Sequence, residues 1–388
     1  MIKTALRRVA KTLTVLLIVF VGLLIWKRGE IKRLLAVNSL FSEEKIVHNF
    51  SHMSDVFFHQ TLTISDTPMT PLPLSAQDMP AEMESWITAR SLTAIVVLKD
   101  GNIAYENYFQ GTNAEDLRIS WSMAKSYLSA LLGILLEEGA IGSIDDPVIQ
   151  YAPELAKSGY ADATIRNVLN MSSGVEFDED YLKFSSDINK MGRVLAMGGS
   201  MDGFSVGITG TIGDPGAAWR YVSIDTHVIG MVIRGATGRS IHDLMAEKLL
   251  APMGLEQSPV MLTDGNGVAF VLGGLNMRTR DYARMGLMFL QNGMLNGQQI
   301  VPAAWVAQST RASAPTKDGQ GQYGFQWWLA ADARQGEYFA RGIYGQYIYV
   351  NTSAGVVVAI NSADRSFREA GSYEQNLSMF RTLAAALN

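Results

Sequence analysis

The stretch from Ile119 to Val148 is a long apolar segment that carries one basic residue, Lys125, near its start. A helix of this composition is expected in a protein core, where an ammonium group is costly to bury. Ser122 precedes the lysine by three residues, so the two side chains would share one face of the helix. The helix start also supplies unpaired N–H groups and the positive end of the dipole. The segment therefore predicts a buried helix with a serine–lysine pair in its first turn.

This pair indicates nucleophilic chemistry. Burial and the helix dipole both disfavour the charged form of Lys125 and so lower its pKa. A lysine that is neutral part of the time can accept the hydroxyl proton of Ser122 and activate it without a histidine. The simpler alternative is a lysine that only extends to solvent.

Two later motifs would support such a site. Tyr221-Val-Ser223 comes just before a predicted helix, and a tyrosine hydroxyl near a lysine can act as a general acid or base. Gly342 and Gly345 interrupt a predicted strand, where glycine lets a substrate use a free backbone N–H as an oxyanion donor. Taken singly, Tyr221 could equally be a core aromatic residue and the glycines a β-bulge.

Strand patterns lie at both ends of the chain, with helical patterns between them. Residues 93–109 have the pattern of a hairpin, 337–363 that of paired strands, and 373–387 that of a closing helix. We therefore expect an α+β fold, in which an antiparallel sheet is flanked by helices and a helical subdomain is inserted in the middle.

The expected domain boundaries follow from this order. The sheet subdomain comprises residues 81–145 and 265–388, and the helical subdomain comprises residues 146–264. Residues 29–80 are predicted to be a connector, because four prolines lie in the short span before residue 81 and favour extended chain.

The N-terminus predicts a membrane anchor. An uncharged run from Thr12 to Trp26 is preceded by basic residues and followed by Lys27 and Arg28. Its 15 residues span roughly 22 Å as a helix, and snorkelling lysines at both ends extend its reach towards the ~30 Å of a bilayer core. Small residues typical of a cleavage site do not follow the run.

We expect residues 1–28 to be an uncleaved, single-pass signal anchor of the inner (cytoplasmic) membrane. The N-terminal positive charges would stay cytoplasmic and place the catalytic domain in the periplasm or another extracytoplasmic space. Lys27, Arg28, Lys32 and Arg33 on the outer flank weaken this orientation. The alternative is an amphipathic or buried helix.

The composition excludes several classes of site. The chain has no cysteine, which rules out disulfides and thiolate chemistry, and its net charge of −5 gives no general attraction to nucleic acid. Its five histidines form no metal-binding motif, so we expect neither metal nor cofactor. The G-x-S-x-G motif of an α/β-hydrolase is absent, and a Ser-His-Asp triad would have to use His227 or His242.

Taken together, the motifs resemble those of the serine β-lactamase and penicillin-binding-protein superfamily. The resemblance is to the class C-like serine hydrolases, and within them to the 6-aminohexanoate-dimer hydrolases and related esterases. It extends from about residue 90 to 385 and includes Ser122-Met-Ala-Lys125, Tyr221-Val-Ser223, "MSSGVEFDEDY", "LLAPMGLE", "GGLNMRTRDYARMGLMFLQNG" and "GIYGQ".

The resemblance implies a role for each matching residue. Ser122 would be the acylated nucleophile, and Lys125 and Tyr221 would transfer protons. The backbone N–H groups of Ser122 and Ile343 would form the oxyanion hole. Contacts to the substrate would come from Tyr181, Asn276, Gly342 and Tyr344.

One departure from the family pattern bears on the substrate. Many penicillin-binding proteins and β-lactamases carry Lys-Thr-Gly on the late strand, whereas this chain has Ala340-Arg341-Gly342. Arg341 should point to the opposite face of the strand from the missing lysine. A small-molecule ester or linear amide is therefore the expected substrate. The alternatives are β-lactamase or D-Ala-D-Ala carboxypeptidase activity, and a non-catalytic binding or scaffold protein of the cell envelope; the oligomeric state is left open.

Overall fold

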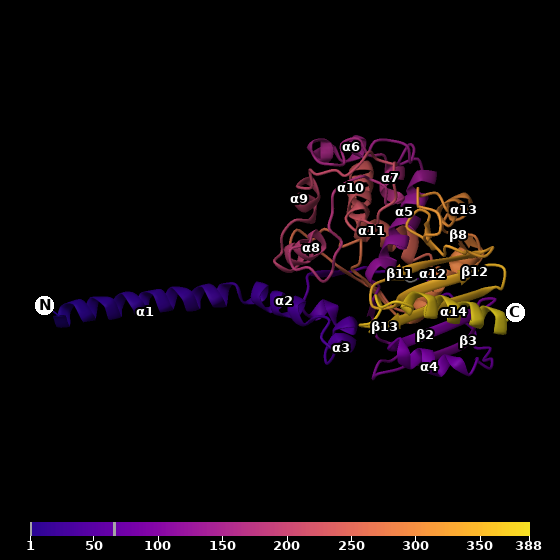
Figure 1. Ribbon diagram of the computed structural model, residues 1–388, viewed down its shortest axis with the longest axis horizontal. Helices are drawn as coiled ribbons and strands as arrows, with labels where there is room; N and C mark the ends of the chain where they lie inside the picture. The colour runs from indigo at the N-terminus through magenta and orange to yellow at the C-terminus, as the bar shows by residue number, and fades with distance from the viewer. Residues whose placement is uncertain (1, 65–66) are drawn as a thin grey trace.

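The computed structural model describes residues 2–64 and 67–388, so Met1 of the predicted anchor and residues 65–66 of the predicted connector lie outside the described residues. One domain contains nearly all of the chain after α2, and the helix α1 (Ile2–Trp26) extends away from it (Figure 1). The helix α2 (Arg28–Ser39) follows α1 and leads into the domain.

A seven-stranded antiparallel sheet forms the centre of the domain, in the order β3-β2-β13-β12-β11-β10-β9. Strands from both ends of the chain meet where β2 pairs with β13, which confirms the expected sheet and its assembly. The central strands are rich in β-branched residues and are buried on both faces. The strands are β2 (Leu92–Lys99), β3 (Asn102–Tyr108), β9 (Gln322–Tyr323), β10 (Trp328–Leu329), β11 (Glu337–Gly342), β12 (Gln346–Asn351) and β13 (Val356–Ser362).

Helices cover both faces of this sheet. On one face lie α4 (Glu82–Ala89) and α14 (Ser372–Ala386), where Trp86 packs edge-on against Phe380 at 5.9 Å. On the other face α12 (Thr279–Leu290) contacts β12 and β13. Gly286 permits this contact, because a Cβ there would lie 2.4 Å from a methyl group of Val357. The predicted closing helix is thus confirmed as α14.

The inserted region is helical, as expected. The helix α5 (Ala124–Glu137) leads from the sheet into it and packs against α10 (Asp225–Thr237). The region also contains α6 (Val148–Tyr151), α7 (Ile165–Leu169), α8 (Asp187–Ala196), α9 (Met201–Val206), α11 (Ile241–Met245), a 3₁₀ turn (Pro153–Lys157) and a π-helical turn (Ala246–Leu250).

The remaining elements are short. A four-stranded sheet has the order β1-β5-β6-β4 and comprises β1 (His59–Thr61), β5 (Val260–Leu262), β6 (Leu275–Met277) and β4 (Arg118–Ile119). A two-stranded ribbon, β7 (Met294–Leu295) with β8 (Gln298–Gln299), and the helix α13 (Ala303–Ser309) complete the domain.

The segment predicted as a connector is more than a tether. It contains α2, α3 (Ile46–Ser51), a 3₁₀ turn (Met53–Asp55) and β1, which pairs with β5. Its side chains Leu40, Phe50 and Leu62 are buried in the main hydrophobic core. Sequence reasoning missed this packing because the partners of these residues lie far along the chain. In the described part of the proline-rich stretch, residues 67–80 form no helix.

The N-terminal helix is the one described helix long and apolar enough to cross a membrane. Residues Leu6–Trp26 form a 21-residue span with a mean hydropathy of 2.4 in its most apolar window, and the domain buries none of that window. The alternative of a helix buried in the protein is therefore wrong. Length and composition alone fit a membrane anchor or a signal sequence.

Candidate active site

Ser122 and Lys125 lie at the start of α5, as the sequence pattern predicts. Ser122 is part of a 3₁₀ turn (Trp121–Met123), and Lys125 lies in the first turn of the helix. Lys125 Nζ donates a hydrogen bond to Ser122 Oγ at 3.1 Å and another to the Leu272 carbonyl oxygen at 2.8 Å. The lysine is only 1% exposed, so its amine does not extend to solvent. The arrangement places an amine next to a half-buried hydroxyl.

The surroundings of Lys125 favour its neutral form. Burial lowers the pKa of the ammonium from its usual range to about 7, and the nearby carboxyl groups of Glu179 and Asp225 counteract only part of that effect. A substantial fraction of the amine is therefore unprotonated near neutral pH and able to accept a proton.

Tyr221 lies beside this pair. Its ring centroid is 5.5 Å from Lys125 Nζ, and its ring stacks on Trp328 at 5.3 Å. Burial and the charge of Glu179 raise the pKa of the phenol, while hydrogen bonding with Ser122 and Ser223 opposes the rise. The phenol thus keeps its proton at neutral pH and is suited to donate it.

The end of β11 packs closely against the backbone of Ser122. A Cβ on Gly342 would lie 3.1 Å from Ser122 N and 2.6 Å from the Ser120 carbonyl oxygen, so only glycine fits without movement. The residues beside the two predicted oxyanion donors are unusual, because Trp121 and Tyr344 have positive φ angles of 44° and 58°. Such strain persists only where the surrounding structure enforces it.

A carboxyl group that sequence reasoning missed organises one wall of the site. Glu179 accepts hydrogen bonds from the hydroxyl and backbone N–H of Ser223 and from the Tyr181 hydroxyl, the last at 2.9 Å. Glu179 lies two residues before Tyr181 in the "DEDY" stretch, where several acidic residues occur together and none stands out. Only the folded chain brings its carboxylate to Ser223 and close enough to Lys125 to affect the pKa of the amine.

A cavity of about 630 Å³ opens at Ser122. Of the predicted substrate contacts, Tyr181 and Tyr344 line it, together with Ile343, and most of its other lining residues are apolar. Asn276 lies elsewhere. Its amide donates to the Val260 and Gly274 carbonyl oxygens inside the small sheet, because β6 turns the side chain towards β5 rather than towards the cavity.

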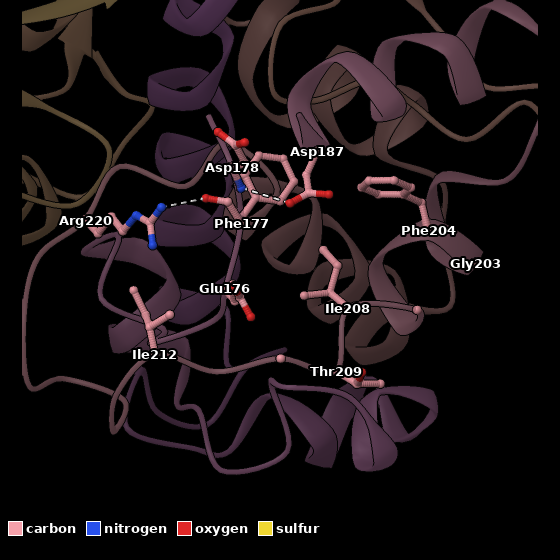
Figure 2. Close-up of a pocket in the computed structure, with 12 residues that line it drawn as sticks. Glu176, Phe177, Asp178, Asp187, Gly203, Phe204, Ile208, Thr209, Ile212 and Arg220 are labelled. Carbon is pink, nitrogen blue, oxygen red and sulfur yellow. Dashed lines mark hydrogen bonds between the residues drawn. The ribbon is translucent and has the colours of Figure 1, made fainter. Parts of the chain in front are cut away.

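A second cavity, of about 720 Å³, lies in the helical region (Figure 2). Figure 2 shows Arg220 and Asp187 at its edge, where hydrogen bonds tie them to the backbone of Phe177 and Asp178. None of the predicted catalytic or substrate-binding residues lines it. The cavity at Ser122 is therefore the candidate active site, because the Ser122 hydroxyl lines it and Lys125 lies directly behind that hydroxyl.

The alternative histidines and the late-strand arginine have other partners. His227 Nε2 lies 2.7 Å from the Asp202 carboxylate, which also binds Arg234, and His242 is buried on α11. Arg341 packs over the ring of Tyr373 on the α14 side of the sheet at 5.0 Å, so its cation points away from the cavity as predicted.

In a comparison with known protein families, the Beta-lactamase family matches residues 87–376. The chain belongs to the Beta-lactamase family. This match confirms the resemblance inferred from the serine–lysine, tyrosine and glycine motifs.

Several of the similar proteins are named as hydrolases or esterases. The 6-aminohexanoate-dimer hydrolase of Paenarthrobacter ureafaciens is 27% identical over 310 residues, which cover 76% of this chain and 78% of that protein. A Bacillus anthracis protein assigned as a 6-aminohexanoate-dimer hydrolase superposes with a TM-score of 0.80 at 22% identity, over 90% of this chain and 96% of the other. A family VIII carboxylesterase superposes with a TM-score of 0.57 at 14% identity, over 81% and 100%. The expected fold and the assignment as a hydrolase are confirmed.

Proposed function

We propose that this chain is a serine hydrolase that cleaves an ester or a linear amide through an acyl-enzyme at Ser122. The observation that carries the proposal is the 3.1 Å hydrogen bond between Ser122 Oγ and the amine of Lys125, whose pKa is lowered by burial to about 7. A buried amine that is partly neutral is the base that a serine needs when no histidine is beside it.

The proposed reaction uses each side chain in turn. Ser122 Oγ attacks the substrate carbonyl carbon while its proton passes to Lys125. The backbone N–H groups of Ser122 and Ile343 stabilise the negative oxygen. The bond to the leaving alcohol or amine then breaks, and Tyr221 donates the proton that the leaving group needs and regains one from Lys125. Water attacks the acyl-serine by the same route, releasing the acid and restoring Ser122.

The late strand offers no cation to hold a substrate carboxylate. Arg341 packs on the α14 side, and the charged residues that line the cavity lie outside this strand, namely Arg193, Arg365, Arg368 and Glu369. The 27% identical relative is named for hydrolysis of a 6-aminohexanoate dimer, a linear amide. We therefore favour a simple ester or linear amide over a β-lactam or a D-Ala-D-Ala peptide.

The domain division and the anchor complete the proposal. We propose that residues 1–28 anchor the chain in the inner membrane and that 81–388 form the hydrolase domain, with 29–80 linking the anchor to that domain and packing into its core. The unburied span Leu6–Trp26 supports the anchor. The catalytic domain would then lie on the periplasmic or extracytoplasmic side.

The test is the loss of hydrolysis when the nucleophile is removed. Ser122→Ala should abolish turnover of p-nitrophenyl butyrate and labelling by a fluorophosphonate probe. Ser129→Ala is the matched control, since this buried serine on the same helix has no hydrogen-bond partner for its hydroxyl among the described residues. Hydrolysis that survives Ser122→Ala refutes the nucleophile, and a wild-type chain that takes up no probe supports a non-catalytic scaffold.

A further inference from the structure

The wall of the active-site cavity continues into the candidate membrane helix. Val37, Leu40 and Phe41, at the end of α2 and just after it, line the cavity that contains Ser122. Only Lys27 separates α2 from α1. A chain that left the bilayer at the end of α1 would therefore continue through α2 directly to the cavity.

The junction of α1 and α2 has the features of a membrane–water boundary. Trp26 is 73% exposed, and Lys27 Nζ lies 4.6 Å from its ring centroid. Arg28, Lys32 and Arg33 follow on α2. Tryptophan and basic residues concentrate at the level of the lipid headgroups. At 1.5 Å per residue, Arg33 lies roughly 10 Å beyond Trp26, near the outer edge of the headgroup layer.

The catalytic domain meets α2 at this same level. Arg33 Nε donates to the Ala196 carbonyl oxygen at 2.6 Å, and its guanidinium lies 4.0 Å from the ring centroid of Phe58. Ala196 ends α8, and earlier residues of α8, including Ile188 and Met191, line the cavity. The helix α8 lies on the side of the domain from which α1 leaves (Figure 1). It therefore connects the expected headgroup level with the cavity.

The rim of the cavity on this side is apolar and exposed. Leu182 and Phe184, in the loop before α8, line the cavity yet are 87% and 74% exposed. The Arg193 guanidinium lies 4.1 Å from the Phe184 ring centroid and donates to the Phe184 carbonyl oxygen, which holds this residue at the rim. Large apolar side chains exposed beside an apolar cavity indicate contact with an apolar partner.

We propose that the substrate is a long-chain acyl ester or amide that enters directly from the lipid bilayer, with its acyl chain in the cavity and its carbonyl at Ser122. The proposal rests on the proposed serine hydrolase function. The acyl group passes from the leaving alcohol or amine to Ser122 Oγ, the leaving group departs with a proton, and water then releases the fatty acid. A cavity of about 630 Å³ is in the range that holds molecules of this size.

The first test asks where the substrate comes from. The full-length chain is reconstituted in phosphatidylcholine vesicles, and p-nitrophenyl palmitate is placed either in the same vesicles or in separate ones. Entry from the bilayer predicts initial rates at least 10-fold higher when enzyme and ester share a membrane. Equal rates would mean that the ester arrives through water, which overturns the proposal.

The second test asks whether the exposed rim selects long chains. The double variant Leu182→Ser and Phe184→Ser should lower the ratio of kcat/KM for the palmitate ester to kcat/KM for the butyrate ester by at least 10-fold. Leu74→Ser is the control, because Leu74 is 75% exposed and does not line the cavity. An unchanged ratio in the double variant overturns the proposal. A wild-type enzyme without Ser122-dependent butyrate hydrolysis overturns the proposed function as well, so the two failures are distinguishable.

Discussion

At the level of single residues, the proposed role of Lys125 as the base predicts the pH range of activity. The amine must be neutral to accept a proton, so kcat/KM should fall on the acid side with a midpoint near pH 7. Glu179 raises the pKa of Lys125 through its negative charge, so Glu179→Gln should shift this midpoint to lower pH. Glu176→Gln, in the same loop but lining the other cavity, is the control. The measurement is the pH profile for p-nitrophenyl butyrate, and a midpoint that stays in place in Glu179→Gln would contradict Lys125 as the base.

The same lysine should also lower the stability of the fold. Its pKa is lowered in the folded chain, so the unfolded chain binds more protons between about pH 7 and the usual lysine range. The free energy of unfolding should therefore rise with pH across this window. Lys125→Met should remove that dependence and stabilise the domain by on the order of 1–4 kcal/mol at pH 7 while abolishing hydrolysis. Urea unfolding at several pH values tests this, and a less stable Lys125→Met variant would count against it.

Residue spacing explains which parts of the site were predictable. Ser122 and Lys125 are three apart, and Gly342 and Ile343 are adjacent, so local geometry already places each pair. Glu179 and the stacked ring of Phe41 reach the site only through tertiary packing, which no local pattern encodes. Asn276 was misplaced because its direction depends on the register of β6, a strand of three residues.

At the level of elements, long segments were predictable and short ones were not. The hairpin β2–β3, the strand pair β11–β12 and the helices α12 and α14 each consist of elements of six residues or more, long enough for an apolar run or a helical period to show. The strands β1, β4, β5 and β6 have two or three residues each, too few for any period to show. Their sheet nonetheless ties the N-terminal segment to the domain, which is why residues 29–80 could not be recognised as packed structure.

The N-terminal segment should support catalysis through Phe41, which lies two residues after the end of α2. Its ring stacks on Tyr344 at 4.5 Å and lies 5.6 Å from Trp121, the two residues with positive φ beside the proposed oxyanion donors. Phe41→Ala should release that strain, move the donors and lower kcat for p-nitrophenyl butyrate about 10-fold or more. Phe58→Ala, in the same segment but packed on Arg33, is the control. Equal kcat values for the two variants would show that the Phe41 ring does not position the oxyanion donors.

At the level of the whole molecule, the proposed anchor predicts which side of the membrane would hold the hydrolase domain. Four basic residues precede the uncharged run Thr12–Trp26, and four follow it as Lys27 and the first turns of α2, so a simple count is balanced. Charges next to a long folded domain have less influence on orientation than those on a short tail. The short N-terminal tail should therefore stay cytoplasmic. Asn388 is exposed at the domain surface and can carry a reporter.

The expected result is periplasmic activity of an alkaline phosphatase fused after Asn388 in a Gram-negative host. A fusion of the same reporter after Trp26 serves as the matched control, because it keeps the span but removes the basic residues of α2. If Lys27, Arg28, Lys32 and Arg33 governed orientation, only the control fusion would be active. Activity of both fusions means that the N-terminal charges and the span suffice, and a long acyl substrate would then be drawn from the outer leaflet of the inner membrane.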